Sequence, residues 1–275
     1  MKRIERLKKI SNAVRKDIIE MSYSCGRAAH PGPALSCADI VTALYFDVMN
    51  FDPQDYANSD RDRFILSKGH ACPVQYAALT ELGLVTKEEY KRLRHVGATL
   101  QGHPTYQKTP GVDMTTGSLG NGLGIGLGMA YYQKLEGSGS RVYVILGDGE
   151  INEGTVWEAV MCAPSLKVGN LVAVVDINGF QSCGACSDIL PTPDLKTIWS
   201  GFGWNVVETD GHDMGHILDA FEAAKSSSDV PTVILARTVK GKGVSFMENN
   251  NAWHQHILTE EQFKQALKDL EVTNY

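Results

Sequence analysis

Residues 141–180 decide the fold; they read RVYVILGDGEINEGTVWEAVMCAPSLKVGNLVAVVDINGF. The apolar run 142–146 is short and rich in β-branched residues, which predicts a buried parallel strand ending just before Asp148. Residues 151–166 predict a helix, and residues 170–176 predict a second buried strand. The stretch is therefore expected to form one strand-helix-strand unit of a parallel sheet.

Two polar side chains follow these strands. Asp148 comes directly after the first strand, and Asn178 comes just after the second. Ligands of open parallel sheets bind outside the carboxyl ends of the strands, so the two side chains should converge. Magnesium prefers oxygen ligands, and a diphosphate supplies several more. Ordinary turn chemistry explains Gly-Asp-Gly or Asn-Gly taken separately, whereas the pair at consecutive strand ends favours a metal and diphosphate site.

Composition limits the class of protein. The chain has 275 residues, of which 43% are hydrophobic and 21% charged, and its net charge is −6. These values indicate an ordinary globular protein, expected to form a single domain over residues 1–275, with no nucleic-acid or anionic-membrane partner. No apolar run approaches the roughly 20 residues that span a bilayer, and no signal peptide is visible. We expect a cytoplasmic protein.

The six cysteines are too sparse for a small disulfide scaffold, so reduced thiols are expected. Cys183 and Cys186 form a C-x-x-C pair. A zinc site would need two more ligands at a matching spacing, and none follows nearby. A redox pair stays open, and we assign no role to these cysteines.

Further elements are predicted by periodicity and turn chemistry. Ser36 is expected to cap the N-terminus of a helix, and Thr259 is expected to open a capping box before the last helix. A helix over residues 3–25 is expected to pack on the outside of the sheet. The other predicted elements are a strand before Ser67, a helix over 73–82, two short helices before 101, a glycine-rich helix within 115–130, a short helix over 194–200, strands over 204–208 and 231–237, and a helix over 211–224.

Four histidines lie in loops or at a strand end. His30 and His103 lie beside proline and glycine, His70 follows a short strand, and His254 lies in a segment rich in glycine and asparagine. A lone loop histidine is usually just solvated, but several in such positions favour a functional site. The glycine-rich stretch 115–130 implies close packing or close ligand approach. It matches neither a dinucleotide fingerprint nor a P-loop.

These motifs, in this order and over nearly the whole chain, resemble transketolase. The pieces that carry the resemblance are His30-Pro31-Gly32, Leu66-Ser67-Lys68-Gly69-His70, Gly102-His103-Pro104, residues 116–120, Gly147-Asp148-Gly149 with Asn178, Lys240-Gly241, and Trp253-His254. The alpha chains of 2-oxo acid dehydrogenases share only the motif from Gly147 to Asn178. The resemblance implies an α/β fold with a mostly parallel sheet flanked by helices, in the form of a thiamine diphosphate-binding domain.

The resemblance also implies roles for particular residues. The metal, Mg²⁺ with Ca²⁺ or Mn²⁺ as substitutes, would be bound by Asp148, Asn178 and the carbonyl of Phe180. Thiamine diphosphate would contact His70, Gly117, Ser118, Leu119, Gly149, Lys240 and His254. His30, His103 and His254 would be catalytic residues facing the ketol end of the substrate, and Glu153 would belong to a proton relay between active sites. Neutral imidazoles suit proton transfer near neutral pH.

Two positions depart from the family pattern. Ala29 replaces the usual glycine before His-Pro, which can alter the wall on the substrate side. The loop after Asn178 reads Phe-Gln-Ser-Cys-Gly-Ala-Cys instead of the more common Ile-Asp-Gly type, which affects the surroundings of the third metal ligand.

A complete transketolase continues for two more domains, one of which supplies the glutamate that activates the aminopyrimidine of the cofactor. We therefore expect the N-terminal subunit of a split transketolase, which transfers a two-carbon ketol unit from a ketose or ketose phosphate to an aldose. It would be active only with a C-terminal transketolase subunit, with two copies of each chain. Two alternatives are an alpha-type subunit of another thiamine diphosphate enzyme and a non-catalytic truncated transketolase paralogue.

Overall fold

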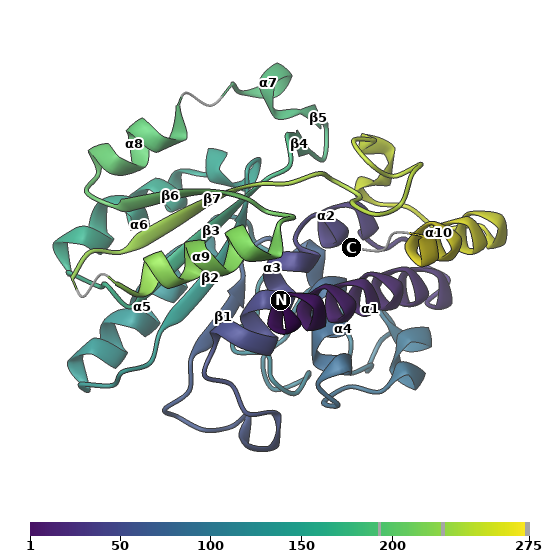
Figure 1. Cartoon of the computed structure of the whole chain (residues 1–275), viewed down its shortest axis with the longest axis horizontal. Coiled ribbons are helices and arrows are strands. Elements are labelled where there is room, and N and C mark those ends of the chain that lie inside the picture. Colours follow the sequence, from purple (N-terminus) through teal and green to yellow (C-terminus); the bar gives the residue numbers. More distant parts are fainter. Residues whose placement is uncertain (192–193, 227–228, 273–275) are drawn as a thin grey trace.

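A five-stranded, entirely parallel sheet forms the centre of the protein (Figure 1). The structure is a computed structural model that describes residues 1–191, 194–226 and 229–272. In spatial order the strands are β1 (Arg63–Leu66), β2 (Val142–Gly147), β3 (Leu171–Ile177), β7 (Thr232–Arg237) and β6 (Asn205–Asp210). Helices cover both faces of the sheet, which confirms the predicted α/β fold.

The helices divide between the two faces. On one side of the sheet lie α2 (Pro31–Ser36), α3 (Ala38–Ala43), α4 (Cys72–Glu81) and α9 (Met214–Lys225), and outside them α1 (Lys2–Ser24) and α10 (Glu260–Val272). The other carries α5 (Asn121–Leu135), α6 (Gly154–Ser165) and α8 (Leu195–Gly201). The remaining described elements are short. They include an antiparallel hairpin of β4 (Phe180–Gln181) and β5 (Gly184–Ala185), followed by α7 (Cys186–Ile189). The others are a π-helical turn, Leu44–Val48, and the 3₁₀ turns Pro53–Asp55, Gly69–Ala71, Lys87–Arg92, Glu150–Asn152 and Asn251–His254.

Two hydrophobic cores lie on opposite faces of the sheet because side chains alternate along each strand. In β2, Tyr143 and Ile145 belong to the core under α1, α4 and α9, whereas Val142 and Val144 belong to the core under α5 and α6. Both faces of the central strands are therefore buried. This is why their sequences are continuous apolar runs rather than alternating ones.

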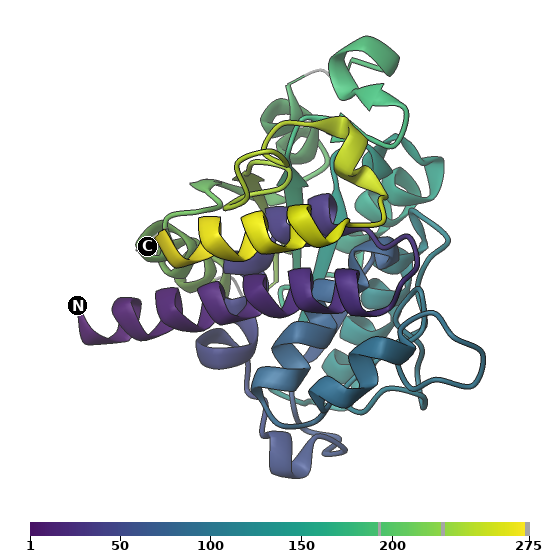
Figure 2. The same ribbon diagram turned by 90° about the vertical axis from the view of Figure 1, so that its right-hand side faces the viewer.

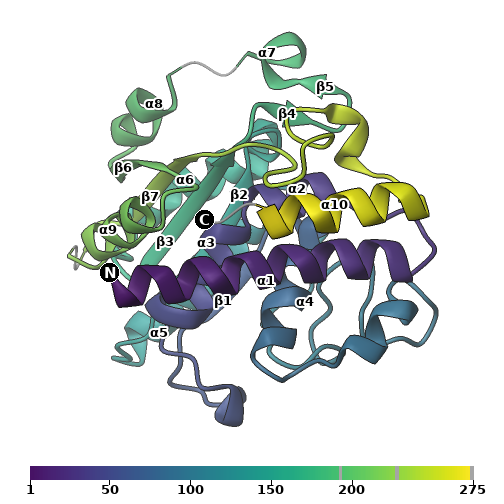
Figure 3. The same cartoon turned by 45° about the vertical axis from the view of Figure 1, so that its right-hand side comes forward.

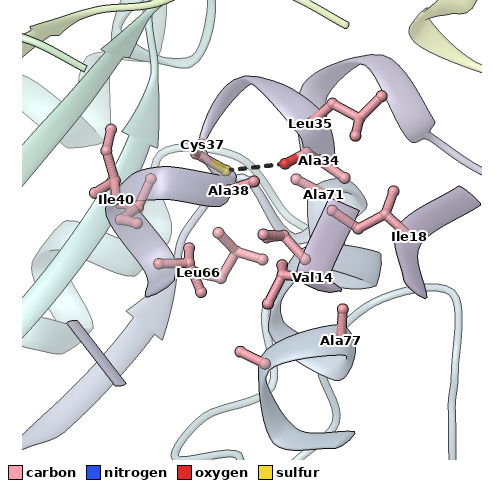
Figure 4. Packing of buried hydrophobic residues seen from close by; sticks show 14 of the residues in the cluster. Val14, Ile18, Ala34, Leu35, Cys37, Ala38, Ile40, Leu66, Ala71 and Ala77 are labelled. Carbon is pink, nitrogen blue, oxygen red and sulfur yellow. Dashed lines mark hydrogen bonds between the residues drawn. The ribbon is translucent and has the colours of Figure 1, made fainter. Parts of the chain in front are cut away.

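Helix α1 lies one layer further from the sheet than expected. It packs against α3, α4 and α10, and its C-terminal half runs beside α10 (Figures 2 and 3). The rings of Tyr23 and Phe263 stack between α1 and α10, with centroids 4.3 Å apart. Val14 and Ile18 of α1 belong to the same buried cluster as Leu66 of β1 and Ala77 of α4 (Figure 4).

Two of the predicted helix starts have different outcomes. The capping box is confirmed: Thr259 Oγ1 accepts from the Gln262 amide at 3.3 Å, and Gln262 Oε1 accepts from the Thr259 amide at 2.9 Å. The N-cap prediction for Ser36 is wrong, because Ser36 is the last residue of α2 and its hydroxyl donates to Asp176 at 2.6 Å. Between α4 and residue 101, the described chain has one 3₁₀ helix instead of two short helices.

None of the helices in the described ranges is both long enough and apolar enough to cross a membrane.

Candidate functional site

The candidate site lies at the edge of the sheet where the parallel strands end. Because β2 and β3 pair in register from Val142 with Leu171 to Gly147 with Asp176, the loops after them begin side by side. The segment 67–70 follows β1, and the segment 238–240 follows β7. Side chains that lie far apart in the sequence therefore meet here, as parallel sheets require.

The two predicted metal ligands are brought together. Asp148 is 6% exposed, and its oxygens accept from the amides of Gly149 at 2.9 Å and Gly179 at 2.6 Å. Asn178 is 7% exposed, and its Oδ1 accepts from the Phe180 amide at 3.1 Å. Each of these oxygens keeps a second lone pair. The arrangement offers hard oxygen ligands from two adjacent loops.

The electrostatics of this pair favour a cation. Burial, together with the nearby charge of Asp176, raises the pKa of Asp148 to about 6. A bound divalent ion would remove that penalty by stabilising the carboxylate. Among the described residues, no group of three His, Cys, Asp or Glu side chains is arranged to hold a metal. The residues fit an ion that takes one carboxylate, one amide, one backbone carbonyl and oxygens from a diphosphate.

Asp176 orients the side chain of Asn178, a role that the sequence motifs did not predict. It is fully buried and accepts from Lys68 Nζ at 2.5 Å, from the Thr238 hydroxyl, and from Asn178 Nδ2 at 3.0 Å. This last bond holds the amide of Asn178 with its oxygen directed away from Asp176. The sequence signal that could have identified Asp176 is its position in an otherwise apolar strand, because a buried charge requires a partner.

Three of the four predicted histidines form a cluster. The ring centroids of His30, His70 and His254 lie 5.3 Å (His30 to His70), 5.6 Å (His30 to His254) and 5.1 Å (His70 to His254) apart. Burial lowers the pKa of His30 to about 3 and that of His254 to about 4, with neighbouring positive charge as a further cause. Burial also lowers the pKa of His70 well below its ordinary value. The cluster is therefore neutral at physiological pH.

The imidazole of His103 packs against Gly117, the first residue of the turn 117–119 that is predicted to bind the cofactor. A Cβ at Gly117 would lie 2.9 Å from the ring of His103, and the φ of Gly117 is +137°. Only glycine fits here, because a side chain would be strained and would displace the imidazole. Burial lowers the pKa of His103 as well. Ser118 is exposed and Leu119 is half-buried in the same turn.

Lys240 provides a buried cation at the site. Its ammonium donates to Asn251 Oδ1 at 2.7 Å and to His254 Nδ1 at 3.0 Å, and it lies 5.6 Å from the centroid of the Phe180 ring. Burial lowers the pKa of Lys240 to about 8. Because His254 Nδ1 accepts from the ammonium, the proton of this neutral imidazole is on Nε2. The site thus combines the Lys240 ammonium with neutral N–H donors, which suits an anionic group.

Two acidic residues close to Asp148 differ sharply. Glu153, the predicted relay residue, is exposed, and no described hydrogen bond or ion pair joins it to the histidines; it lies against Gly120. Glu150 has no predicted role in the sequence motifs, yet it is buried. Its carboxylate accepts from the hydroxyl of Ser67 at 2.5 Å, the amide of Gly120 at 2.9 Å and the amide of Gly147 at 3.0 Å. It ties together the ends of β1 and β2 and the start of α5.

The structure places the two departures from the family pattern in loops beside the candidate site. Ala29 forms a bridge with His256 through two backbone hydrogen bonds, of 3.1 and 3.0 Å, which a glycine could also make and which holds the loop of His30 beside that of His254. Gln181, in the hairpin after Asn178, lies over Gly149, where a Cβ would come within 2.5 Å of the Gln181 Cβ. Cys183 and Cys186 are free thiols in and after this hairpin.

Acid is expected to destabilise the protein through the histidine cluster. The folded pKa of His30 is about 3, below its ordinary value of 6.5, so the unfolded chain binds more protons between these limits. The stabilising contribution is complete above pH 6.5 and is lost as the pH falls toward 3. Urea unfolding at pH 7.5 and 5.0 should show a smaller loss of unfolding free energy for His30→Ala than for the wild type. An equal loss in both proteins would contradict a neutral, half-buried His30.

Comparisons with known proteins agree with this geometry. The family described as "Transketolase, thiamine diphosphate binding domain" matches residues 7–274. One relative is a subunit of the apulose-4-phosphate transketolase of Phocaeicola vulgatus. It is 37% identical over 267 residues, which cover 97% of this chain and 94% of the relative. The 6-deoxy-6-sulfo-D-fructose transketolase subunit SqwG of a Clostridium species is 40% identical, covering 95% of this chain and 94% of the relative.

Full-length transketolases match over part of their length. The structure of transketolase from Leishmania mexicana superposes with a TM-score of 0.90 at 29% identity, covering 96% of this chain and 41% of that one. The chain therefore spans about 41% of that transketolase. The family model matches nearly the whole chain, relatives of similar length are covered almost completely, and the fold is shared. We conclude that this chain belongs to the transketolase family and corresponds to its thiamine diphosphate-binding domain.

Proposed function

We propose that the chain is the N-terminal subunit of a split transketolase that uses thiamine diphosphate and Mg²⁺ and works with a C-terminal subunit. The observation that carries the proposal is the convergence, at one sheet edge, of the Asp148 and Asn178 oxygens, the Lys240 ammonium and the neutral histidine cluster. Relatives of matching length are named as transketolase subunits, which supports a two-chain enzyme.

The chain's own residues would bind and orient the cofactor. Asp148, Asn178 and the carbonyl of Phe180 would hold Mg²⁺, for which Ca²⁺ or Mn²⁺ can substitute. Lys240, His70 and His254 would bind anionic oxygens of the diphosphate, and the turn 117–119 with Gly149 would allow close backbone approach. When bound, thiamine diphosphate supplies the carbanion chemistry for transferring a two-carbon ketol unit.

The histidines would handle protons of the substrate. A neutral imidazole can accept a proton at one nitrogen and donate one at the other, so His30 and His103 can exchange protons with the hydroxyl groups of a ketose. His254, whose Nδ1 accepts from Lys240, would act as a donor through its Nε2–H. His30 and His254 are half-buried, so water would screen these hydrogen bonds less than at an exposed position. Glu153, exposed at the start of α6, would join a carboxylate relay completed by a second copy of the chain.

The substrate would be a ketose with an anionic end. By their names, the relatives act on apulose-4-phosphate and on 6-deoxy-6-sulfo-D-fructose, which carry a phosphate and a sulfonate. We propose a phosphorylated or similarly anionic ketose as donor and an aldose as acceptor. The assembly would contain two copies of each chain, with residues 1–275 as one domain, in the cytoplasm and without nucleic-acid or membrane partners.

Variants at two histidines test the proposed roles. His30→Ala and His103→Ala are expected to lower kcat/KM for the ketose donor by about 100-fold, the usual contribution of a positioned acid or base, and to leave cofactor affinity nearly unchanged. Steady-state kinetics and calorimetry with thiamine diphosphate measure the two effects in the assembled complex. His216→Ala, an exposed histidine on α9, is the matched control. Loss of cofactor affinity with normal kinetics at saturating cofactor would show that the assigned role is wrong.

A further inference from the structure

The segment Asp210-Gly211-His212-Asp213 lies at the carboxyl end of β6, and none of its residues is among those proposed to bind the cofactor or the substrate. Gly211 donates its amide to the Arg237 carbonyl at 2.8 Å, and a Cβ on Gly211 would collide with Thr238. Asp210 accepts from the amide of His212 at 2.9 Å. The segment is thus packed closely against the chain that leads from β7 to Lys240.

His212 bridges two parts of the fold. Its Nδ1 lies 2.9 Å from Asp39 Oδ2, and its Nε2 lies 2.8 Å from the backbone nitrogen of Val239. The backbone N–H of Val239 can only donate, so Nε2 accepts and carries no proton. The proton of the neutral ring is therefore on Nδ1 and is donated to Asp39.

Asp39 is a rigid anchor for this imidazole. Arg15, which is fully buried, donates to both of its oxygens at 2.9 and 2.5 Å, and Ser11 donates at 2.5 Å. Burial alone would raise the pKa of Asp39, but the Arg15 guanidinium and the bond from His212 hold it below its ordinary value. The carboxylate stays ionised and fixed in place, and so fixes the ring.

Val239 lies between two residues of the candidate site. Thr238 donates its amide to the Ile177 carbonyl at 3.0 Å and its hydroxyl to Asp176, the residue that orients Asn178. Lys240 carries the buried ammonium next to His254. The bond from Val239 to His212 therefore holds the backbone from which this ammonium projects.

We propose that His212 is a positioning residue for the cofactor: anchored by Asp39, it accepts from the Val239 amide and thereby fixes the Lys240 ammonium against the diphosphate. This inference rests on the proposed function. Groups that orient ligand-binding side chains typically contribute a factor of about 10 to 100 to affinity.

Two variants separate this role from a general structural one. His212→Gln places an acceptor oxygen near the former Nε2 and can keep the bond from Val239. His212→Asn places a donor near the former Nδ1 and can keep only the bond to Asp39. His216→Asn, an exposed histidine one turn away on α9, is the control.

Calorimetry with thiamine diphosphate and Mg²⁺ on the assembled complex gives one readout, and amide hydrogen exchange at Val239 in this chain gives a second that does not need the cofactor. We expect His212→Asn to raise the Kd by about tenfold or more and to lose protection at Val239, with the KM for the ketose unchanged. We expect His212→Gln to stay within about threefold of the wild type, because it retains the acceptor.

An unchanged Kd or an unchanged exchange rate in His212→Asn would overturn the proposal, and so would a larger loss in His212→Gln than in His212→Asn. Absence of thiamine diphosphate binding by the wild-type complex would instead overturn the proposed function, and the role of Lys240 with it. Binding of wild type and control with equal affinity shows that the site itself is intact.

Discussion

Asp148→Asn is expected to weaken Mg²⁺-dependent binding of thiamine diphosphate by at least about 100-fold, equivalent to about 2.8 kcal/mol. Asparagine keeps the size of the side chain and one oxygen, so the variant removes mainly the negative charge. That charge is buried at the end of β2, where an ion pair is screened little by water. Calorimetry at limiting Mg²⁺, with the partner chain present, measures the loss.

The control for this experiment is Asp188→Asn, which removes an exposed carboxylate from the neighbouring helix α7. Excess Mg²⁺ should restore part of the affinity of Asp148→Asn, because the remaining oxygens can still hold the ion weakly. If Asp148→Asn binds thiamine diphosphate as tightly as the wild type at limiting Mg²⁺, Asp148 is not a metal ligand.

The parallel sheet could be predicted from the sequence because its strands are buried on both faces. Residues 142–146 and 171–175 are continuous apolar runs, and each ends at a glycine or polar residue that marks the edge of the sheet. Helix ends were harder to predict. Ser36 is a good capping residue in isolation, but it contacts Asp176, which is 140 residues away, and this contact determines its environment.

The site residues that could be predicted from the sequence are those that stand in a short, recognisable motif. Asp148, Asn178 and the loop histidines fall in this group, and the resemblance to transketolase supplied their roles. Lys68, Glu150 and His212 are fixed mainly by tertiary contacts: Lys68 pairs with Asp176 across 108 positions, and His212 pairs with Asp39 across 173. The position of Asp176 in an apolar strand indicates that it needs a partner, but a single sequence does not show which distant residue that partner is.

Purified alone, the chain is expected to have no transketolase activity. By the family resemblance, the glutamate that acts on the aminopyrimidine of the cofactor belongs to another domain, and relatives of this length are named as subunits. Tyr132 and Leu135 of α5 and Met161 of α6 are more than half exposed, so these two helices present apolar surface that a partner would cover. The partner should therefore both complete the site and bury this surface.

The most direct test is a coupled transketolase assay on this chain by itself, on the isolated C-terminal partner and on their mixture, with thiamine diphosphate, Mg²⁺ and several anionic ketoses. We expect no turnover by either chain, and turnover by the mixture that exceeds both by at least about 100-fold. Turnover by the purified chain at the rate of the mixture, with mass spectrometry showing no partner in the sample, would contradict it.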